Sequence, residues 1–167
     1  MTDGRLAVAV LADTHIRRGG RRRLPPTAYA VLERADVILH GGDVVDDALL
    51  DELNELAPTH AVLGNNDGEL VGVLPGSRVL DLAGVQVAMI HDSGPRRGRE
   101  TRLWRQFPTA DVVVFGHSHE PVDTVGVGHQ RLFNPGSPTE RRRQPSHTMG
   151  WLALADGRVI EHRIIVL

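Results

Sequence analysis

The chain has 167 residues, of which 41% are hydrophobic and 24% charged, and its formal net charge is −2. This length and composition are typical of a globular chain that forms one domain with a sizeable core. The small negative charge argues against a generic binder of nucleic acid or membrane surfaces, and the absence of cysteine excludes disulfides, thiol nucleophiles and thiolate metal sites.

The first half of the chain alternates apolar runs with helical patterns. We expect strands at residues 6–12, 37–40 and 60–63 and helices at residues 27–34 and 46–56. Thr27 would cap the first helix, and Pro58 would end the second, in which leucines recur at helical spacing. The order strand, helix, strand, helix, strand is typical of an α/β layer with parallel strands.

The second half is rich in strands and contains one short helix. Strands are expected at residues 78–82, 85–90, 111–115, 122–127, 131–133, 149–155 and 158–166, and the helix at residues 100–107. Ala83-Gly84 and Asp156-Gly157 stand between neighbouring runs as hairpin turns. Because no linker or repeat divides the chain, the sequence predicts one domain, over residues 1–167, that contains two sheets.

The amino terminus passes directly into a short apolar run, without the longer apolar region and cleavage site of a signal peptide. No stretch approaches the roughly 18 apolar residues of a membrane span. We therefore expect a cytoplasmic protein with no membrane partner.

Side chains that bind metals stand at the ends of the predicted strands. They are Asp13 and His15, Asp43, Asn65, His91, and His117 with His119. In an open α/β sheet, binding sites form outside the carboxyl ends of the strands. His117 and His119 could reach into one cleft if the backbone turns there, and Gly116 would permit such a turn. Alone, this pair would be weak evidence, since two polar residues also suit a turn. The recurrence of such residues at five strand ends is what indicates a metal site.

These residue types suit a centre with two divalent cations. Two cations about 3.5–4 Å apart need a shared anionic ligand, and the Asp43 carboxylate is the natural bridge. Neutral His and Asn ligands leave the site positive enough to attract a phosphate. Without cysteine, such a ligand set favours Mn, Fe, Zn, Ni or Mg over soft metals.

The same residues, in the same order, resemble the motifs of the calcineurin-like metallophosphoesterases. The matching motifs are Asp13-Thr14-His15, Gly42-Asp43, Gly64-Asn65, His91 and Gly116-His117-Ser118-His119. The short length, Gly64-Asn65-Asn66-Asp67 and Asn134-Pro135-Gly136-Ser137 are similar to the small bacterial and archaeal phosphodiesterase branch of that family. The resemblance implies an α/β (α+β) fold, a two-sheet β-sandwich flanked by helices, which agrees with the strand pattern.

The resemblance also implies a ligand set and a mechanism. One cation would be held by Asp13, His15, Asp43 and His119, and the other by Asp43, Asn65, His91 and His117. A hydroxide bridging the two cations would attack phosphorus in line with the leaving oxygen. Mn²⁺ is the expected ion, with Ni²⁺, Fe²⁺, Zn²⁺ and Mg²⁺ as alternatives. The activity would be that of a phosphodiesterase acting on a small phosphate ester or a nucleotide.

Position 66 departs from the family pattern. Many family members have His there, which protonates the leaving group or steadies the phosphate, whereas this chain has Asn66. Asn can hydrogen-bond a phosphate oxygen but cannot deliver a proton at neutral pH. We therefore place Asn66 with Asp43 and His117 as catalytic residues and expect a preference for substrates with good leaving groups.

Several neighbouring residues have two interpretations. Asp67 would either bind a ligand or loop amide near the site or cap a loop. His40 would either orient a carboxylate or be a satisfied buried histidine. Asn134-Pro135-Gly136-Ser137 would shape a turn beside the site rather than contact substrate. The histidines without motif context are not expected to bind metal, namely His60, His129, His147 and His162.

Arginines cluster in the loops that follow three of the motifs. They are Arg17, Arg18, Arg21, Arg22 and Arg23, then Arg96, Arg97 and Arg99, and finally Arg141, Arg142 and Arg143. They would form either a basic rim that draws polyanionic substrates or ordinary solvated loops in a chain whose basic residues are all arginine. A nucleic-acid partner is not indicated.

Two other functions compete with that of a phosphodiesterase. Some relatives of the family fold have lost metal ligands and serve as scaffolds in protein assembly, which the intact ligand set argues against here. A phosphomonoesterase or a hydrolase of nucleotide signals would use the same metals. The sequence predicts neither the physiological substrate, the native metal nor the oligomeric state.

Overall fold

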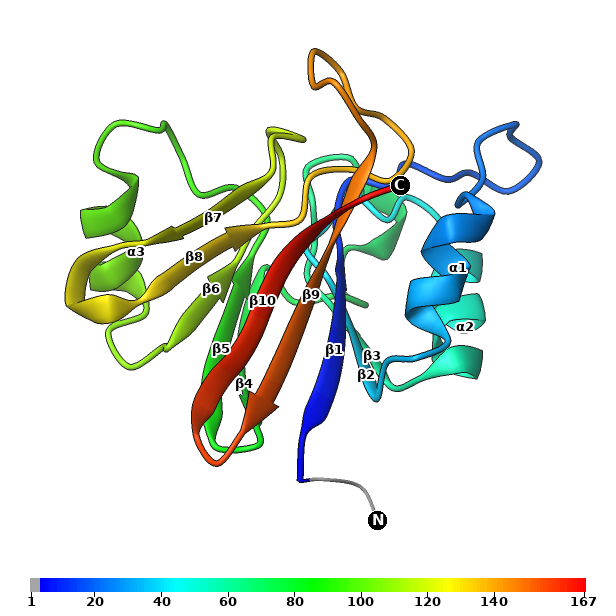
Figure 1. Ribbon diagram of the computed structural model, residues 1–167. Helices are drawn as coiled ribbons and strands as arrows, with labels where there is room; N and C mark the ends of the chain where they lie inside the picture. The colour runs from blue at the N-terminus through cyan, green and yellow to red at the C-terminus, as the bar shows by residue number, and fades with distance from the viewer. Residues whose placement is uncertain (1–3) are drawn as a thin grey trace.

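The structure, a computed structural model, describes residues 4–167 and contains two five-stranded sheets packed face to face (Figure 1). The first sheet, in the order β10-β9-β1-β2-β3, consists of β1 (Leu6–Leu11), β2 (Val37–His40), β3 (Thr59–Ala61), β9 (Thr148–Ala155) and β10 (Arg158–Val166). The second, in the order β4-β5-β6-β8-β7, consists of β4 (Ser77–Leu82), β5 (Val85–Ile90), β6 (Val112–Val114), β7 (Val122–Val125) and β8 (Arg131–Asn134). The expected fold, two sheets flanked by helices, is confirmed.

Helices cover the outer faces of both sheets (Figure 1). They are α1 (Pro26–Leu32), α2 (Asp47–Leu56) and α3 (Arg99–Gln106), with the short 3-10 helices η1 (Gly68–Leu70) and η2 (Val127–His129). The pair α1 and α2 packs on the first sheet, and α3 packs on the second. Within residues 4–167, no helix is long and apolar enough to cross a membrane.

Strand β1 shows why the apolar runs in this chain are continuous. Its side chains point alternately to two faces. Val8 and Val10 join the core between the two sheets, whereas Ala9 and Leu11 join the core beneath α1 and α2. Burial on both faces is typical of parallel strands covered by helices.

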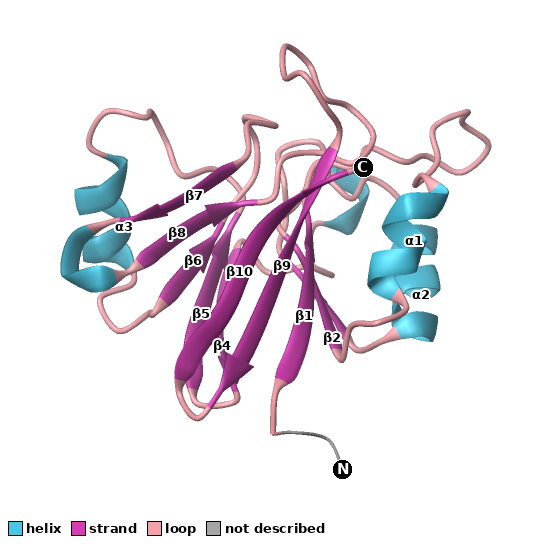
Figure 2. Cartoon of the chain, viewed as in Figure 1, coloured by secondary structure: helices cyan, strands magenta, loops and turns pink. Residues whose placement is uncertain are grey.

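The strand directions bring several loops to one edge of the molecule. In the first sheet β1, β2 and β3 are parallel, and in the second β5, β6 and β8 are parallel. The carboxyl ends of each parallel set therefore lie at one edge of its sheet. Figure 2 shows long loops gathered at the edge where the carboxyl terminus of the chain also lies.

Some local expectations are wrong. Helix α1 begins at Pro26 with Pro25 as its N-cap, so Thr27 is not the cap. Proline suits the first turn because its φ is already helical and its missing N–H has no partner there. Strand β7 ends at Val125, where the chain turns into η2, and the sequence did not predict either 3-10 helix. The expected start of α2 is correct, since the Asp46 side chain caps it.

Candidate metal centre

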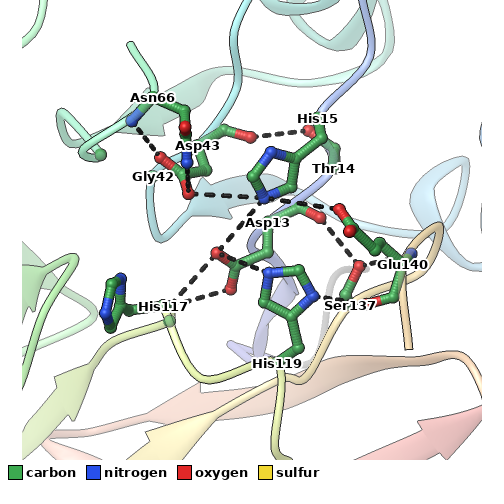
Figure 3. A network of polar contacts seen from close by, with 12 residues as sticks. Asp13, Thr14, His15, Gly42, Asp43, Asn66, His117, His119, Ser137 and Glu140 are labelled. Carbon is green, nitrogen blue, oxygen red and sulfur yellow. Dashed lines mark hydrogen bonds and ion pairs between the residues drawn. The ribbon is translucent and has the colours of Figure 1, made fainter. Parts of the chain in front are cut away.

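The structure brings together all the side chains that the sequence predicts as metal ligands. In chain order they are Asp13 and His15 after β1, Asp43 after β2, Asn65 after β3, His91 after β5, and His117 and His119 after β6. The backbone N of His117 donates to Asp13 Oδ2 at 2.9 Å, which joins the ends of β1 and β6 (Figure 3). The two sheets therefore contribute to one site.

Asp13, His15 and His119 form the first group of ligand atoms. Their ligand atoms all lie within 4.8 Å of one another. Asp13 Oδ1 lies 3.5 Å from His119 Nε2 and 3.9 Å from His15 Nε2. These are three of the four residues that the family resemblance places around one cation.

The second group shares Asp13 with the first. It contains Asp13, Asp43 and His91, again with ligand atoms within 4.8 Å of one another. Asn65 Oδ1 lies 3.0 Å from His91 Nε2 and 3.1 Å from His117 Nδ1. The three residues expected to share the second cation with Asp43 therefore face one another. The proximity of Asp13 Oδ1 to His91 Nε2, at 3.8 Å, was not expected from the sequence.

Asp43 lies between the two histidines that belong to different groups. Its Oδ2 is 3.4 Å from His15 Nε2 and also 3.4 Å from His91 Nε2. A carboxylate oxygen in this position suits a ligand shared between two cations, whose mutual repulsion it would reduce.

Most of these side chains project from an unusual backbone. The φ angle is 54° at Asp13, 46° at His15, 59° at Asp43, 71° at His117 and 60° at His119. A residue other than glycine in this left-handed region costs about 1 kcal/mol or more. Such conformations persist only where the surroundings enforce them, and they cluster at functional sites. Here they turn alternate residues after β1 and β6 toward one another.

Gly116 provides space rather than the turn expected from the sequence. It is not among the glycines with positive φ, so the left-handed residues are the histidines that follow it. A Cβ at position 116 would lie 2.8 Å from Asp13 Oδ2 and 2.9 Å from Ala12 Cβ. Glycine therefore allows the loop after β6 to approach the end of β1.

The donor set fits divalent cations. Among the described residues, His15 Nε2 and His119 Nε2 are buried and have no hydrogen-bond partner. Buried polar atoms without a partner are costly. Both atoms face the Asp13 carboxylate (Figure 3). A cation held by these three side chains would complete their bonding.

The pKa values of Asp13, Asp43, His15 and His119 agree with that fit. Burial raises the pKa of the Asp13 carboxyl to about 7, so a nearby cation would offset the cost of its charge. Burial also opposes ionisation of Asp43, but contacts from His91 and Asn66 outweigh it and hold the pKa of Asp43 below its usual range. Burial lowers the pKa of His15 and of His119, which favours the neutral rings that bind metals.

Asp67 holds the backbone around Asp43. Its Oδ2 accepts hydrogen bonds from Asp43 N at 2.9 Å and from Gly64 N at 2.7 Å, and its Oδ1 accepts one from Val45 N at 2.7 Å. The side chain is buried, with 1% exposure. Of the two interpretations left open by the sequence, the loop-amide partner is correct.

Backbone carbonyls orient two of the histidines. His91 Nδ1 lies 2.7 Å from Gly41 O, and His119 Nδ1 contacts Glu140 O. In each ring the Nε2 atom is thereby directed into the site, as is common for metal-binding histidines. Glu140 was not predicted from the sequence, because a residue type does not indicate which contacts the backbone carbonyl makes.

The end of β8 and the loop that follows it contact the backbone around the candidate ligands, as expected for a segment that shapes a turn beside the site. Ser137 Oγ donates to Asp13 O at 2.8 Å, and Asn134 Nδ2 donates to Gly116 O at 3.1 Å. Asn134 Nδ2 also donates to Ser118 Oγ at 3.2 Å, so it contacts the residue between the two histidines as well. Both Asn134 and Ser137 are buried.

Asn66 and His40 make contacts that restrict their roles. The Asn66 Nδ2 atom donates to Asp43 Oδ2 at 2.8 Å.

His40 is fully buried, with Nε2 at 3.0 Å from Thr14 Oγ1 and Nδ1 at 3.2 Å from Gly42 N. His40 is therefore a satisfied buried histidine that links the ends of β1 and β2, and within residues 4–167 its ring makes no hydrogen bond or ion pair with a carboxylate.

Arginines from two of the three clusters contact the site's backbone. Arg22 Nη1 donates to His15 O, and Arg142 Nη1 donates to His117 O, each at 3.2 Å. Arg22 also lies 3.4 Å from the Glu140 carboxylate. The loops that follow the first motif and the Asn134 turn therefore flank the candidate ligands.

Comparisons with known proteins agree with this geometry. A model of the calcineurin-like phosphoesterase superfamily domain matches residues 6–157. A probable metallophosphoesterase of Methanothermobacter thermautotrophicus is 31% identical over 163 residues, which cover 96% of this chain and 92% of the relative. Vacuolar Protein Sorting 29 from Cryptosporidium parvum has a TM-score of 0.79 at 18% identity, covering 99% of this chain and 100% of that one. A novel archaeal phosphodiesterase has a TM-score of 0.72 at 23% identity, covering 97% and 100%. The last two likenesses show the fold.

Proposed function

The chain belongs to the calcineurin-like phosphoesterase superfamily, a metal-dependent family, and we propose that it is a phosphodiesterase with two divalent cations. The observation that carries this proposal is the position of the Asp43 carboxylate, 3.4 Å from both His15 and His91. One cation would be held by Asp13, His15, Asp43 and His119, and the other by Asp43, Asn65, His91 and His117. When bound, the cations, with Mn²⁺ as the expected ion, supply a hydroxide nucleophile near neutral pH and neutralise phosphoryl charge.

The residues of the chain position this chemistry. Asn66 and Asp67 fix the side chain and the backbone of Asp43, and Gly41 O fixes the ring of His91. Asn66 cannot deliver a proton at neutral pH. The leaving oxygen would therefore take its proton from water, and substrates with good leaving groups would react fastest. We place this activity in a single cytoplasmic domain over residues 1–167.

Two alternatives keep the same fold. The first alternative is a non-catalytic scaffold that binds a protein partner, because the chain shares its fold with Vacuolar Protein Sorting 29. A fold alone does not determine which of these functions a chain has. A phosphomonoesterase or a hydrolase of nucleotide signals would use the same ligand set. Catalysis is supported by the close approach of the predicted ligand side chains to one another.

Hydrolysis of bis-p-nitrophenyl phosphate separates these functions. The parent should require Mn²⁺, and His117→Ala should lose at least about 100-fold in kcat/KM. His129→Asn, which changes an exposed histidine outside the site, should retain the parent activity. Absence of metal-dependent turnover would favour the scaffold. Faster turnover of p-nitrophenyl phosphate than of the diester would favour the phosphomonoesterase.

A further inference from the structure

A hollow of about 490 Å³ opens directly beside His15. Its lining is formed by His15, Arg17, Gly20, Arg21 and Arg22. Because His15 is a candidate ligand of the first cation, this hollow adjoins the position where a scissile phosphate would bind. Its volume is of the order found for small-molecule sites.

Two of the arginines that line the hollow are unpaired. Within residues 4–167, the guanidinium groups of Arg17 and Arg21 make no hydrogen bond or ion pair, whereas Arg18, Arg22 and Arg23 all donate to carboxylates or carbonyls. Both side chains are exposed, so water solvates their charges in the free protein. Their N–H donors are therefore available to an anion that binds beside His15.

The loop that carries these arginines is fixed to the fold. Ile16 forms a parallel bridge with Val45. The backbone N of Arg18 donates to Asp46 Oδ2 at 2.8 Å, so the loop is held by the same Asp46 that caps α2. The unpaired guanidinium groups are consequently presented from an anchored backbone, which reduces the entropy lost when they bind a ligand.

We propose that this hollow binds a second phosphate group of a small-molecule substrate, next to the phosphate that is hydrolysed. This inference rests on the proposed function. Guanidinium groups match the oxygens of a phosphate with paired N–H donors. The net charge of −2 argues against a polymeric nucleic acid as the usual ligand. The substrate class is therefore a phosphate diester whose nucleoside or comparable moiety carries a further phosphate.

A matched pair of esters tests this assignment. Thymidine 5′-(p-nitrophenyl phosphate) and its 3′-phosphorylated form differ only in the second phosphate. The parent with Mn²⁺ should prefer the 3′-phosphorylated ester by about tenfold or more in kcat/KM. The double variant Arg17→Gln, Arg21→Gln should lose this preference. The double variant Arg105→Gln, Arg158→Gln removes the same charge from two exposed positions and should retain it. The start of β10, at Arg158, lies at the opposite end of the sheet from the loop (Figure 1).

Binding supplies a readout that does not depend on catalysis. Without metal, thymidine 3′,5′-bisphosphate should bind the parent about tenfold more tightly in calorimetry than it binds the Arg17, Arg21 double variant. The inference would be overturned if the parent and the Arg17, Arg21 double variant showed the same preference between the two esters and the same affinity for the bisphosphate. It would also be overturned if the Arg105, Arg158 control lost the preference to the same extent. A thymidine tetranucleotide that binds far more tightly than the bisphosphate would overturn the small-molecule assignment. Failure of the parent to hydrolyse either ester would instead count against the proposed phosphodiesterase.

Discussion

Asn66 holds the Asp43 carboxylate through two hydrogen bonds, from its backbone N to Oδ1 and from its Nδ2 to Oδ2, each 2.8 Å long. The side chain at the position where many family members have His is therefore engaged with the central carboxylate of the site. Asn66 acts in this structure as a positioning residue for Asp43. This contact changes what substitutions at position 66 should do.

Replacing Asn66 separates its positioning role from the missing proton donor. Asn66→Ala removes the Nδ2 hydrogen bond and should lower kcat about tenfold on all diesters, as expected for one charge-assisted hydrogen bond. Asn66→His loses the same bond but adds an ionisable group, so its rate on a dinucleotide should rise relative to its rate on bis-p-nitrophenyl phosphate. The check is the ratio of the two rates. A ratio in Asn66→His no higher than in Asn66→Ala would contradict a role for position 66 in leaving-group protonation.

Asp67→Asn should destabilise the fold. The buried carboxylate accepts three backbone hydrogen bonds, whereas an amide offers one acceptor oxygen and brings a donor against an N–H group. We expect a loss of about 3 kcal/mol in the free energy of unfolding, measured by urea denaturation. Asp51→Asn, on the exposed side of α2, should stay within about 0.5 kcal/mol of the parent. Equal stability of the two variants would contradict the role assigned to Asp67.

His40 should make stability depend on pH. Burial lowers the pKa of His40 to about 3 from the usual 6.5. Between these two pH values, the unfolded chain binds a proton at His40 and the folded chain does not. The contribution of His40 is therefore present above pH 6.5 and is lost as the pH falls toward 3. This contribution to the free energy of unfolding changes by at most about 1.4 kcal/mol per pH unit.

Unfolding in urea between pH 7 and pH 4.5, with chelator present, measures this slope. His40→Gln should show a shallower fall in stability than the parent, because glutamine does not titrate. His129→Asn, at an exposed position, should follow the parent. Parallel curves for the parent and His40→Gln would show that His40 does not resist protonation in the fold.

The order of strands and helices in the sequence was sufficient to predict where the candidate ligands would gather. Connectivity places the ends of parallel strands of one sheet at one edge, so Asp13 and Asp43 could be expected to meet without knowledge of their contacts. The meeting of these two with His117, which follows a strand of the second sheet, was implied by the family resemblance. The Asp, Asn and His residues at those strand ends then indicated a site for divalent cations. The local pattern of Leu49 and Leu53, both buried in α2, similarly predicted a helix face.

Contacts between distant segments could not be predicted in the same way. Asp67 binds the Asp43 backbone across 24 residues, and its residue type alone suits a loop cap equally well. The positive φ angles of His15 and His119 are imposed by surrounding contacts against local preference, so local preference cannot reveal them. Thr27 was misassigned because Pro25 and Pro26 begin α1 without a side-chain cap.

In the proposed metal centre, the two histidines after β6 bind different cations. Chains stripped of metal by chelator, reloaded with Mn²⁺ and freed of excess should be analysed for metal content by mass spectrometry. We expect two ions per chain in the parent and in His129→Asn, about one in His117→Ala, about one in His119→Ala, and almost none when both histidines are replaced. A single ion in the parent, or one ion retained when both histidines are replaced, would contradict this assignment.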